Sequence, residues 1–311
     1  MKLKALRAGG RIAVISPASA PKADAVERGV ERLRAQGYEV VLGEHALARG
    51  PLYYAGDVKS RVADLHAAFA DSAVNAIVCT RGGWGSAELL PHLDAELIRT
   101  HAKPFVGYSD HTSLAIWMQN EAGLSTFYGP MVAADFARGH GVEESVDLPS
   151  WRHALQGDAA WSVGAMEGMR MLRPGDAEGI LFGGCISILA ESLGTPYALR
   201  PPAEGGVLFL EDVGTKPYQW DRLLVHLRYA GVLDAAKGIV FGDMTQCTSD
   251  AVESELLEQA ILHSLRDFAG PIAIGLRCGH VNTPNVTLPL GAKVRLSARE
   301  VRLEILESVV E

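Results

Sequence analysis

The first half of the chain alternates short, almost continuously apolar runs with amphipathic stretches of helical periodicity. The runs predict β-strands over 11–16, 38–42, 76–80, 105–108 and 125–128, with helices over 22–36, 58–70, 86–90 and 112–121. Strands that are apolar on both faces are typical of parallel sheets, because helices cover both sides of such a sheet. We therefore expect an α/β fold with a doubly wound parallel sheet of the flavodoxin or Rossmann type. Ligands in this fold bind at the carboxyl ends of the strands.

The composition changes between residues 140 and 180, where a polar stretch is punctuated by six glycines. Beyond it, strands are predicted over 206–210, 238–241, 272–275, 293–296 and 301–306, and helices over 186–193, 219–230 and 253–265. This pattern indicates a smaller α+β domain. We expect an N-terminal α/β domain over 1–150, an inter-domain linker over 151–178 and a C-terminal domain over 179–311.

Composition excludes several classes of function. The 311 residues are 48% hydrophobic with a formal net charge of −8, which argues against binding to nucleic acid or to an anionic membrane. The four cysteines are scattered without a C-x-x-C pair, so we expect buried thiols of a reducing compartment and no metal framework. The apolar run at 12–15 is too short for an export signal, and no run reaches membrane-spanning length. A cytoplasmic protein is expected.

A short apolar strand ends in Gly107-Tyr108-Ser109-Asp110, directly before an amphipathic stretch. A strand, a sharp turn and a helix in this order expose the serine hydroxyl at the turn, and the following amide opens the helix. This arrangement would supply a nucleophile together with half of an oxyanion hole. The pattern lacks the second glycine of the usual elbow. The alternative is a Ser-Asp cap on an ordinary helix.

The glycine-rich loop Arg81–Ser86 follows the third predicted strand. Glycine lets backbone amides approach an anion, so the loop could hold a phosphate or supply the second amide of an oxyanion hole. The sequence matches neither the dinucleotide fingerprint nor the P-loop, which makes a nucleotide site the weaker interpretation. Tight turns also use glycine for backbone reasons alone.

A serine nucleophile needs a base and a group that orients this base. Among ten histidines, His280 stands out because it follows a glycine at the start of an irregular loop. Glu211 and Asp212 end an apolar strand and could face a cleft, although they could equally cap a helix or form a loop salt bridge. The residues alone leave these alternatives open.

The sequence resembles the LD-carboxypeptidases, a family of serine peptidases also called muramoyltetrapeptide carboxypeptidases. The resemblance is carried, in the family's order and over nearly the whole chain, by Ser16–Ser19, Arg81–Ser86, Gly107–Asp110, Tyr128–Met131, Gly183–Gly184, Leu193–Pro196, Phe209–Val213, Asp221–Arg222, Gly279–His280 and Thr287–Gly291.

This resemblance implies a Ser109, Glu211 and His280 triad with the active site between two domains, and an oxyanion hole made by the amides of Gly83 and Asp110. It also implies a cytoplasmic homodimer without cofactor or metal, which releases terminal D-alanine from murein tetrapeptides during cell-wall recycling. Arg81 and Trp84 are candidate substrate contacts, Arg81 for the free carboxylate. One departure is Cys185, which stands where many members have asparagine after the Gly-Gly pair. Another is the variable loop after His280.

Two other functions are compatible with these residues. A relative within the family hydrolyses an amide in a peptidyl-nucleotide antibiotic and so confers self-immunity, and Trp151 or Trp161 could stack on the base of such a substrate. The other alternative is a non-catalytic module that binds a small peptide.

Overall fold

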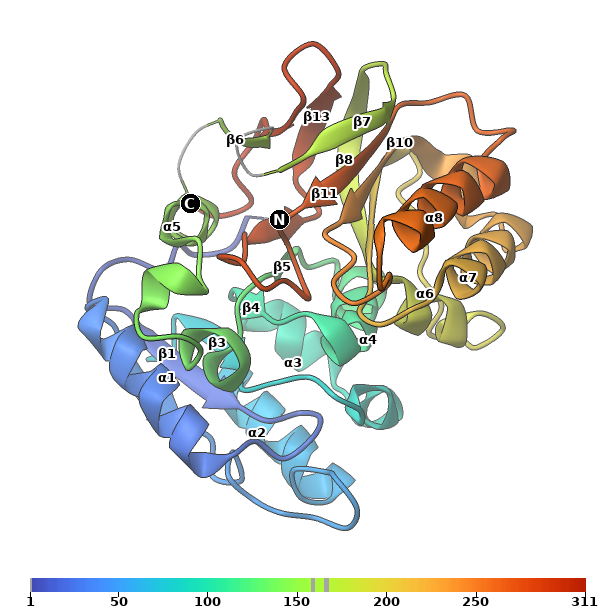
Figure 1. The fold of residues 1–311 in the computed structure, drawn as a ribbon. Coiled ribbons are helices and arrows are strands. Elements are labelled where there is room, and N and C mark those ends of the chain that lie inside the picture. Colours follow the sequence, from blue (N-terminus) through green and yellow to red (C-terminus); the bar gives the residue numbers. More distant parts are fainter. Residues whose placement is uncertain (1, 158–159, 165–167) are drawn as a thin grey trace. The chain divides into compact units, whose positions relative to one another are not determined.

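The structure, a computed structural model, describes residues 2–157, 160–164 and 168–311 (Figure 1). The chain divides into two compact units. The first comprises Met1–Asp158, Thr283–Pro289 and Ser308–Glu311, and the second comprises Ala159–Asn282 and Leu290–Glu307.

The first unit is built on a sheet whose strand order is β12-β5-β4-β3-β1-β2. Its strands are β1 (Arg11–Ile15), β2 (Glu39–Leu42), β3 (Ala76–Cys79), β4 (Phe105–Val106), β5 (Thr126–Tyr128) and β12 (Leu288–Leu290). Strands β1 to β5 are paired in parallel. Their order, 2-1-3-4-5, is that of the flavodoxin-like doubly wound fold, so the expected fold class is confirmed. The order reverses between β1 and β3, and the loops after these two strands therefore border the expected ligand site.

Helices pack onto this sheet through apolar faces. They are α1 (Ala23–Ala35), α2 (Val58–Ala70), α3 (Ala95–Thr100), α4 (Thr112–Trp117) and α5 (Leu148–Gln156). In α1, Val26, Val30 and Leu33 recur at helical spacing and are buried. Helix α2 begins at the predicted residue because the Asp57 carboxylate accepts a hydrogen bond from the amide of Ser60.

The second unit contains a mixed sheet of order β6-β14-β13-β8-β9-β10-β11-β7. Its strands are β6 (Trp161–Gly164), β7 (Arg170–Arg173), β8 (Ala177–Cys185), β9 (Gly206–Glu211), β10 (Ala236–Gly242), β11 (Ile272–Leu276), β13 (Lys293–Ser297) and β14 (Arg302–Ile305). Strands β8 to β11 are parallel, and the flanking strands are antiparallel. The helices are α6 (Ile186–Ser192), α7 (Pro217–Tyr229) and α8 (Ala251–Ser264), of which α7 and α8 lie side by side (Figure 1).

Strand β8 is central in this sheet, yet the sequence pattern did not predict it. Its glycines resemble turn residues, but they permit a close approach between strands. A Cβ on Gly183 would lie 2.0 Å from the carbonyl oxygen of Phe209. A Cβ on Gly206 would lie 1.8 Å from the carbonyl oxygen of Ile180. Glycine therefore marks tight pairing between β8 and β9 rather than a loop.

The structural units differ from the expected boundaries. Helix α5 extends the first unit beyond residue 150, while β6 and β7 of the expected 151–178 linker belong to the second sheet. Residues 158–159 and 165–167 of that stretch lie outside the described residues. The segment Thr283–Pro289 returns to the first unit, where the amide of Thr287 donates to Ser150 Oγ over 3.0 Å. Local pattern cannot reveal such a return, because its contacts join residues far apart in the sequence.

Candidate active site

Ser109 occupies a strained turn after β4. Its φ of 64° lies in the left-handed region, which non-glycine residues rarely adopt and which costs about 1–3 kcal/mol. The 3-10 helix Ser109–His111 begins there and leads into α4. A Cβ on Gly107 would lie 2.9 Å from the His111 ring, so glycine is required just before the turn. The predicted strand, sharp turn and helix are present. The helix begins at Ser109 itself, in a strained backbone conformation, and not after an unstrained N-cap residue.

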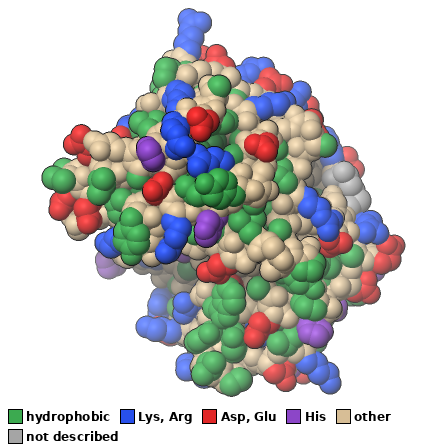
Figure 2. All heavy atoms as spheres, turned by 90° about the vertical axis from the view of Figure 1, so that its right-hand side faces the viewer, with side chains coloured by type: hydrophobic (Ala, Val, Ile, Leu, Met, Phe, Trp, Pro, Cys, Tyr) green, Lys and Arg blue, Asp and Glu red, His purple; other side chains and the backbone are tan. Residues whose placement is uncertain are grey.

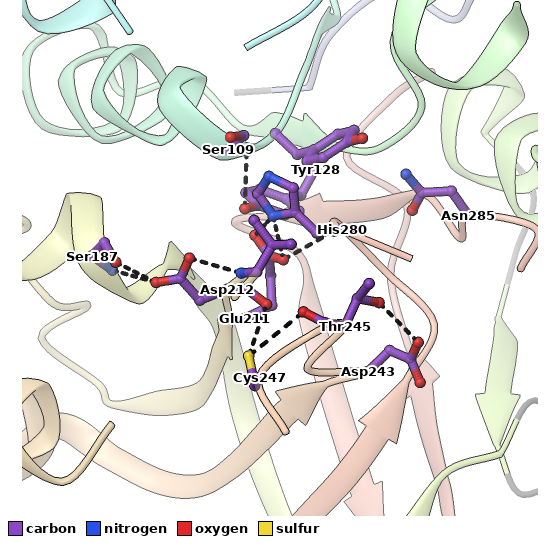
Figure 3. Close-up of polar contacts among 12 residues, drawn as sticks. Ser109, Tyr128, Ser187, Glu211, Asp212, Asp243, Thr245, Cys247, His280 and Asn285 are labelled. Carbon is purple, nitrogen blue, oxygen red and sulfur yellow. Dashed lines mark hydrogen bonds and ion pairs between the residues drawn. The ribbon is translucent and has the colours of Figure 1, made fainter. Parts of the chain in front are cut away.

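The amide of Ser109 donates a hydrogen bond to the hydroxyl of Tyr128 over 3.1 Å. Tyr128 is buried at the end of β5 and belongs to the first unit together with Ser109. The close-up in Figure 3 includes both residues. Sequence reasoning did not identify this support, although the Tyr128–Met131 block was part of the family resemblance.

The glycine loop after β3 lies directly against Ser109. A Cβ on Gly82 would lie 3.0 Å from Ser109 Cβ, 3.1 Å from Ser109 Oγ and 3.4 Å from the amide nitrogen of Asp110. Neither the amide of Gly83 nor that of Asp110 donates to a partner within the described residues. The amide of Asp110 and that of Gly83, the residue after Gly82, are thus candidates for the two donors that an oxyanion hole requires.

We expect Gly82→Ala to lower kcat/KM about 100-fold, because the added methyl group would displace the serine or the amide of Asp110. Gly82 does not have a positive φ, so the substitution tests space rather than backbone strain. Gly141→Ala is the matched control, since its Cβ would meet only the flexible Glu143 side chain. Steady-state kinetics and thermal unfolding of both variants test this. Parental activity in Gly82→Ala would contradict the close fit.

His111 holds the loop against the turn. Its Nε2 lies 3.0 Å from the carbonyl oxygen of Arg81, and its Nδ1 lies 2.9 Å from Ser86 Oγ. The ring is fully buried, and burial lowers its pKa to about 4. The neutral ring donates from Nε2 to the carbonyl, so Nδ1 accepts from the serine hydroxyl. His111 therefore positions the loop, and both of its ring nitrogens are engaged in doing so.

The lowered pKa of His111 predicts a dependence of stability on pH. The unfolded chain binds a proton near pH 6.5, whereas the folded state does so only near pH 4. Folding is therefore favoured above pH 6.5, and this contribution, about 3 kcal/mol in full, is lost as the pH falls towards 4. We expect His111→Asn to be less stable at pH 7 and to lose less of its free energy of unfolding as the pH falls. Urea unfolding at several pH values measures this, and an equal decrease of the unfolding free energy with pH in both proteins would contradict it.

Buried charges fix the remainder of the loop. The Asp110 carboxylate accepts from the amide of Ser86 over 2.9 Å, and burial raises the pKa of Asp110. The Arg61 guanidinium donates to the carbonyl oxygens of Gly85 (2.8 Å) and Pro17 (3.1 Å) and pairs with Glu88. The loops after β1 and β3, at the switch point of the sheet, are thereby joined into one rigid edge.

Glu211 and His280 form a pair within the second unit (Figure 3). His280 Nδ1 lies 2.9 Å from Glu211 Oε2, and the amide of His280 donates to the same oxygen over 2.9 Å. An ionised carboxylate only accepts hydrogen bonds, so Nδ1 of His280 is the ring nitrogen that carries a proton in this pair. The Glu211 side chain is 1% exposed, whereas that of His280 is 19% exposed.

Two glycines make room for the Glu211 side chain. A Cβ on Gly279, whose φ is 94°, would lie 2.5 Å from Glu211 Cδ. A Cβ on Gly242, at the end of β10, would lie 2.6 Å from Glu211 Cβ. The chain thus accommodates a buried carboxylate that is held against one imidazole.

Asp212 has a different role from Glu211. Its carboxylate accepts from the amide of Ser187 over 3.3 Å, from the hydroxyl of Ser187, and from the amide of Val213 over 2.8 Å (Figure 3). Ser187 lies in the first turn of α6, so Asp212 helps to satisfy the start of that helix. The capping interpretation therefore applies to Asp212 but not to Glu211.

The two candidate substrate contacts differ in their surroundings. A Cβ on Gly83 would lie 3.6 Å from Arg81 Nη2, so the cation lies beside one of the unoccupied amides. Trp84 is 36% exposed, and its amide donates to Ser19 Oγ over 3.1 Å. Ser109, Gly83, Asp110 and Arg81 are thus brought together in the first unit, while Glu211 and His280 meet in the second.

The cysteines, the candidate metal ligands, the helix lengths and the surface charges are described next. All four cysteines are buried, as expected, and burial is the main cause that raises the pKa of Cys79, Cys185 and Cys247. Among the described residues, no cluster of three His, Cys, Asp or Glu side chains could bind a metal ion. None of the described helices combines the length and the apolar character needed to span a bilayer. Basic and acidic side chains are interspersed on the face in Figure 2.

Comparisons with known proteins show the family to which the chain is related. Residues 12–129 match the model for the LD-carboxypeptidase N-terminal domain, and residues 178–296 match that for the C-terminal domain. A probable murein peptide carboxypeptidase of Bacillus subtilis is 36% identical over 302 residues, which cover 96% of this chain and 92% of that protein.

Two solved structures are similar throughout their length. The muramoyltetrapeptide carboxypeptidase of Oxalobacter formigenes superimposes with a TM-score of 0.83 at 28% identity, covering 96% of this chain and 99% of the other. The microcin C7 self-immunity protein MccF in complex with aspartyl sulfamoyl adenosine gives a TM-score of 0.89 at 25% identity, covering 100% of both chains.

The fold and these matches define a serine-type carboxypeptidase, a hydrolase. The chain belongs to the LD-carboxypeptidase family, which confirms the resemblance drawn from the sequence blocks.

Proposed function

We propose that this protein is a serine LD-carboxypeptidase that releases the terminal D-alanine from murein tetrapeptides and so serves cell-wall recycling. Ser109 is the nucleophile, His280 the general base and acid, and Glu211 the group that orients His280. The amides of Gly83 and Asp110 form the oxyanion hole. The observation that carries the proposal is the buried Glu211 carboxylate held 2.9 Å from Nδ1 of His280, which leaves Nε2 as a base.

The proposed reaction begins with attack of Ser109 Oγ on the carbonyl carbon between the diamino acid and D-alanine. The Oγ proton passes to Nε2 of His280, and the Glu211 carboxylate stabilises the imidazolium that forms. The carbonyl oxygen gains negative charge in the tetrahedral intermediate. Donation from the amides of Gly83 and Asp110 stabilises this charge, and the helical start at Ser109 adds to it.

Collapse of this intermediate breaks the C–N bond, and Nε2 of His280 donates its proton to the leaving amine of D-alanine. A water molecule then attacks the ester on Ser109 while Nε2 takes a proton from it. The second intermediate expels Ser109 Oγ, which regains its proton from His280. Strain at Ser109 supports this role, because left-handed backbone at a serine persists only where the surrounding structure fixes it.

The choice of murein peptide as substrate is favoured by the relatives. The Bacillus subtilis protein and the Oxalobacter formigenes enzyme both carry murein or muramoyl peptide names, and both match nearly the whole of this chain. A carboxypeptidase must also recognise a free carboxylate, and Arg81 beside Gly83 is a suitable cation.

A second candidate is hydrolysis of an amide in a peptidyl-nucleotide antibiotic. The similarity in fold to MccF favours it, since that protein is seen with an aspartyl sulfamoyl adenosine. Trp151, one of the tryptophans considered for stacking on the base, is buried and donates from its indole nitrogen to Tyr38 over 3.3 Å. It therefore contributes to the core of the first unit, which weakens this candidate.

Incubation with purified murein tetrapeptide, with murein tripeptide as a blank, tests the proposal through chromatographic detection of D-alanine. A peptidyl sulfamoyl adenosine is assayed in parallel. The proposed function predicts release of D-alanine and little cleavage of the nucleotide conjugate. Cleavage of the conjugate alone would favour the immunity function. Cleavage of neither would favour the non-catalytic module.

A further inference from the structure

The first unit contains a cavity of about 340 Å³ beside the glycine loop, lined in part by Ser19, Arg49, Tyr53 and Arg81. Ligand pockets have volumes of about 300–1,000 Å³, so this one suits a small group rather than an extended peptide. None of the described residues that line it is Asp or Glu.

Two guanidinium groups lie at this cavity without a counterion from the chain. In the described part of the protein, neither Arg49 nor Arg81 forms an ion pair or a hydrogen bond through its side chain. Arg61, by contrast, is paired with Glu88 over 2.7 Å. Two unpaired cations on one cavity attract an anionic ligand, and the planar fork of arginine matches a carboxylate.

The loop that carries Arg49 is fixed by its backbone. The amide of Gly50 donates to the carbonyl oxygen of Tyr54 over 2.9 Å, and the amide of Ala20 donates to the carbonyl oxygen of Tyr53 over 2.8 Å. A Cβ on Gly50 would lie 2.6 Å from the carbonyl oxygen of Gly56, so only glycine fits there. Leu52 is held at a φ of 55° with its side chain 83% exposed. Strained backbone of this kind is often found at ligand-binding sites.

The cavity adjoins the candidate oxyanion hole. Ser19 lines the cavity, and its Oγ would lie 2.4 Å from a Cβ on Gly83. Arg81 also lines the cavity, with Nη2 3.6 Å from the same position. One residue of extended chain spans about 3.3–3.6 Å. If the scissile carbonyl of the substrate is bound by the amide of Gly83, the carboxylate of the following residue therefore reaches this cavity.

We propose that this cavity binds the carboxylate of the C-terminal residue that is cleaved, with Arg49 and Arg81 as its two cationic partners. The inference rests on the proposed carboxypeptidase function and adds Arg49 as a specificity-determining residue. The pair of arginines restricts the enzyme to chain ends, because the amide of a continuing peptide leaves both cations without an anion.

The test compares a substrate ending in D-alanine with the same peptide ending in D-alaninamide. For Arg49→Ala, we expect kcat/KM on the free acid to fall about 10- to 100-fold, mainly through KM, with little change on the amide. Arg49→Lys should recover part of the loss. Lys59→Ala on α2 removes one exposed charge outside the cavity and serves as the matched control. Equal losses on acid and amide would overturn the inference while leaving the proposed function intact.

A binding measurement tests the carboxylate site independently of catalysis. Ligand-observed NMR on the Ser109→Ala protein is used to titrate D-alanine, D-alaninamide and adenosine monophosphate. Binding of D-alanine that is lost with the amide and in the Arg49→Ala double variant supports a carboxylate site, even if murein tetrapeptide is not cleaved. Arg49-dependent binding of the nucleotide in preference to D-alanine would overturn it, and so would equal binding of the acid and the amide.

Discussion

Ser109→Ala is expected to lower kcat on murein tetrapeptide by about 10⁴- to 10⁶-fold, with KM nearly unchanged. The substitution removes the atom that forms the acyl-enzyme, whereas the amides of Gly83 and Asp110 remain available to the substrate. The residual rate should reflect the oxyanion hole and binding alone. Release of D-alanine, followed over hours for the variant, measures the change.

Ser113→Ala is the control for this experiment. Ser113 is a buried serine in α4, four residues after the candidate nucleophile. It should keep kcat within a few-fold of the parent, so any general effect of a lost buried hydroxyl is measured separately. A Ser109→Ala protein that retains even a tenth of the parental kcat would rule out Ser109 as the nucleophile.

Glu211→Gln should be the second largest loss, about 10⁴-fold in kcat. The side chain keeps its size, so the space left by Gly279 and Gly242 remains filled. A carboxamide can turn its NH₂ group towards His280, which would favour the proton on Nε2 and remove the base. It also withdraws the negative charge that stabilises the imidazolium. Kinetics over a range of pH, combined with circular dichroism, measure the effect on a folded protein.

Asp212→Asn is the matched control, since it alters the adjacent carboxylate at nearly constant volume. Its contacts are with Ser187 and the amide of Val213, so the expected effect is a loss of about 1 kcal/mol in stability with kcat changed only a few-fold. If Asp212→Asn reduced kcat as strongly as Glu211→Gln, the distinction between the two carboxylates would be wrong.

The sequence allowed accurate prediction of β1 to β5, because these strands are apolar on both faces and the helices between them have clear signals, whereas β12 of the same sheet was not predicted. Helix α2 was predicted at the residues where it lies, over 58–70. The pattern was less informative in the second unit. Strand β8 was missed because its glycines serve close strand pairing, and β6 and β7 are short edge elements within a stretch that resembled a linker.

The sequence indicated the candidate site residues that lie at strand ends or within the family's sequence blocks. Glu211 faces His280 and Asp212 caps a helix, yet both stand at the same strand end, so only three-dimensional contacts separate them. The surroundings of Arg49 were not predictable. Its loop is joined to the segment around Ser19 by backbone hydrogen bonds between residues more than 30 positions apart, Arg81 only shares the cavity with it, and no motif marks it.

The covalent role of Ser109 is tested most directly by trapping the acyl-enzyme. The protein is mixed with murein tetrapeptide, quenched in acid within milliseconds, digested and mapped by mass spectrometry. The proposed mechanism predicts a mass increase equal to the substrate minus D-alanine, on the peptide that contains Ser109, and its absence in Ser109→Ala. Release of D-alanine with the adduct on another residue, or with the Ser109→Ala protein fully active, would contradict it.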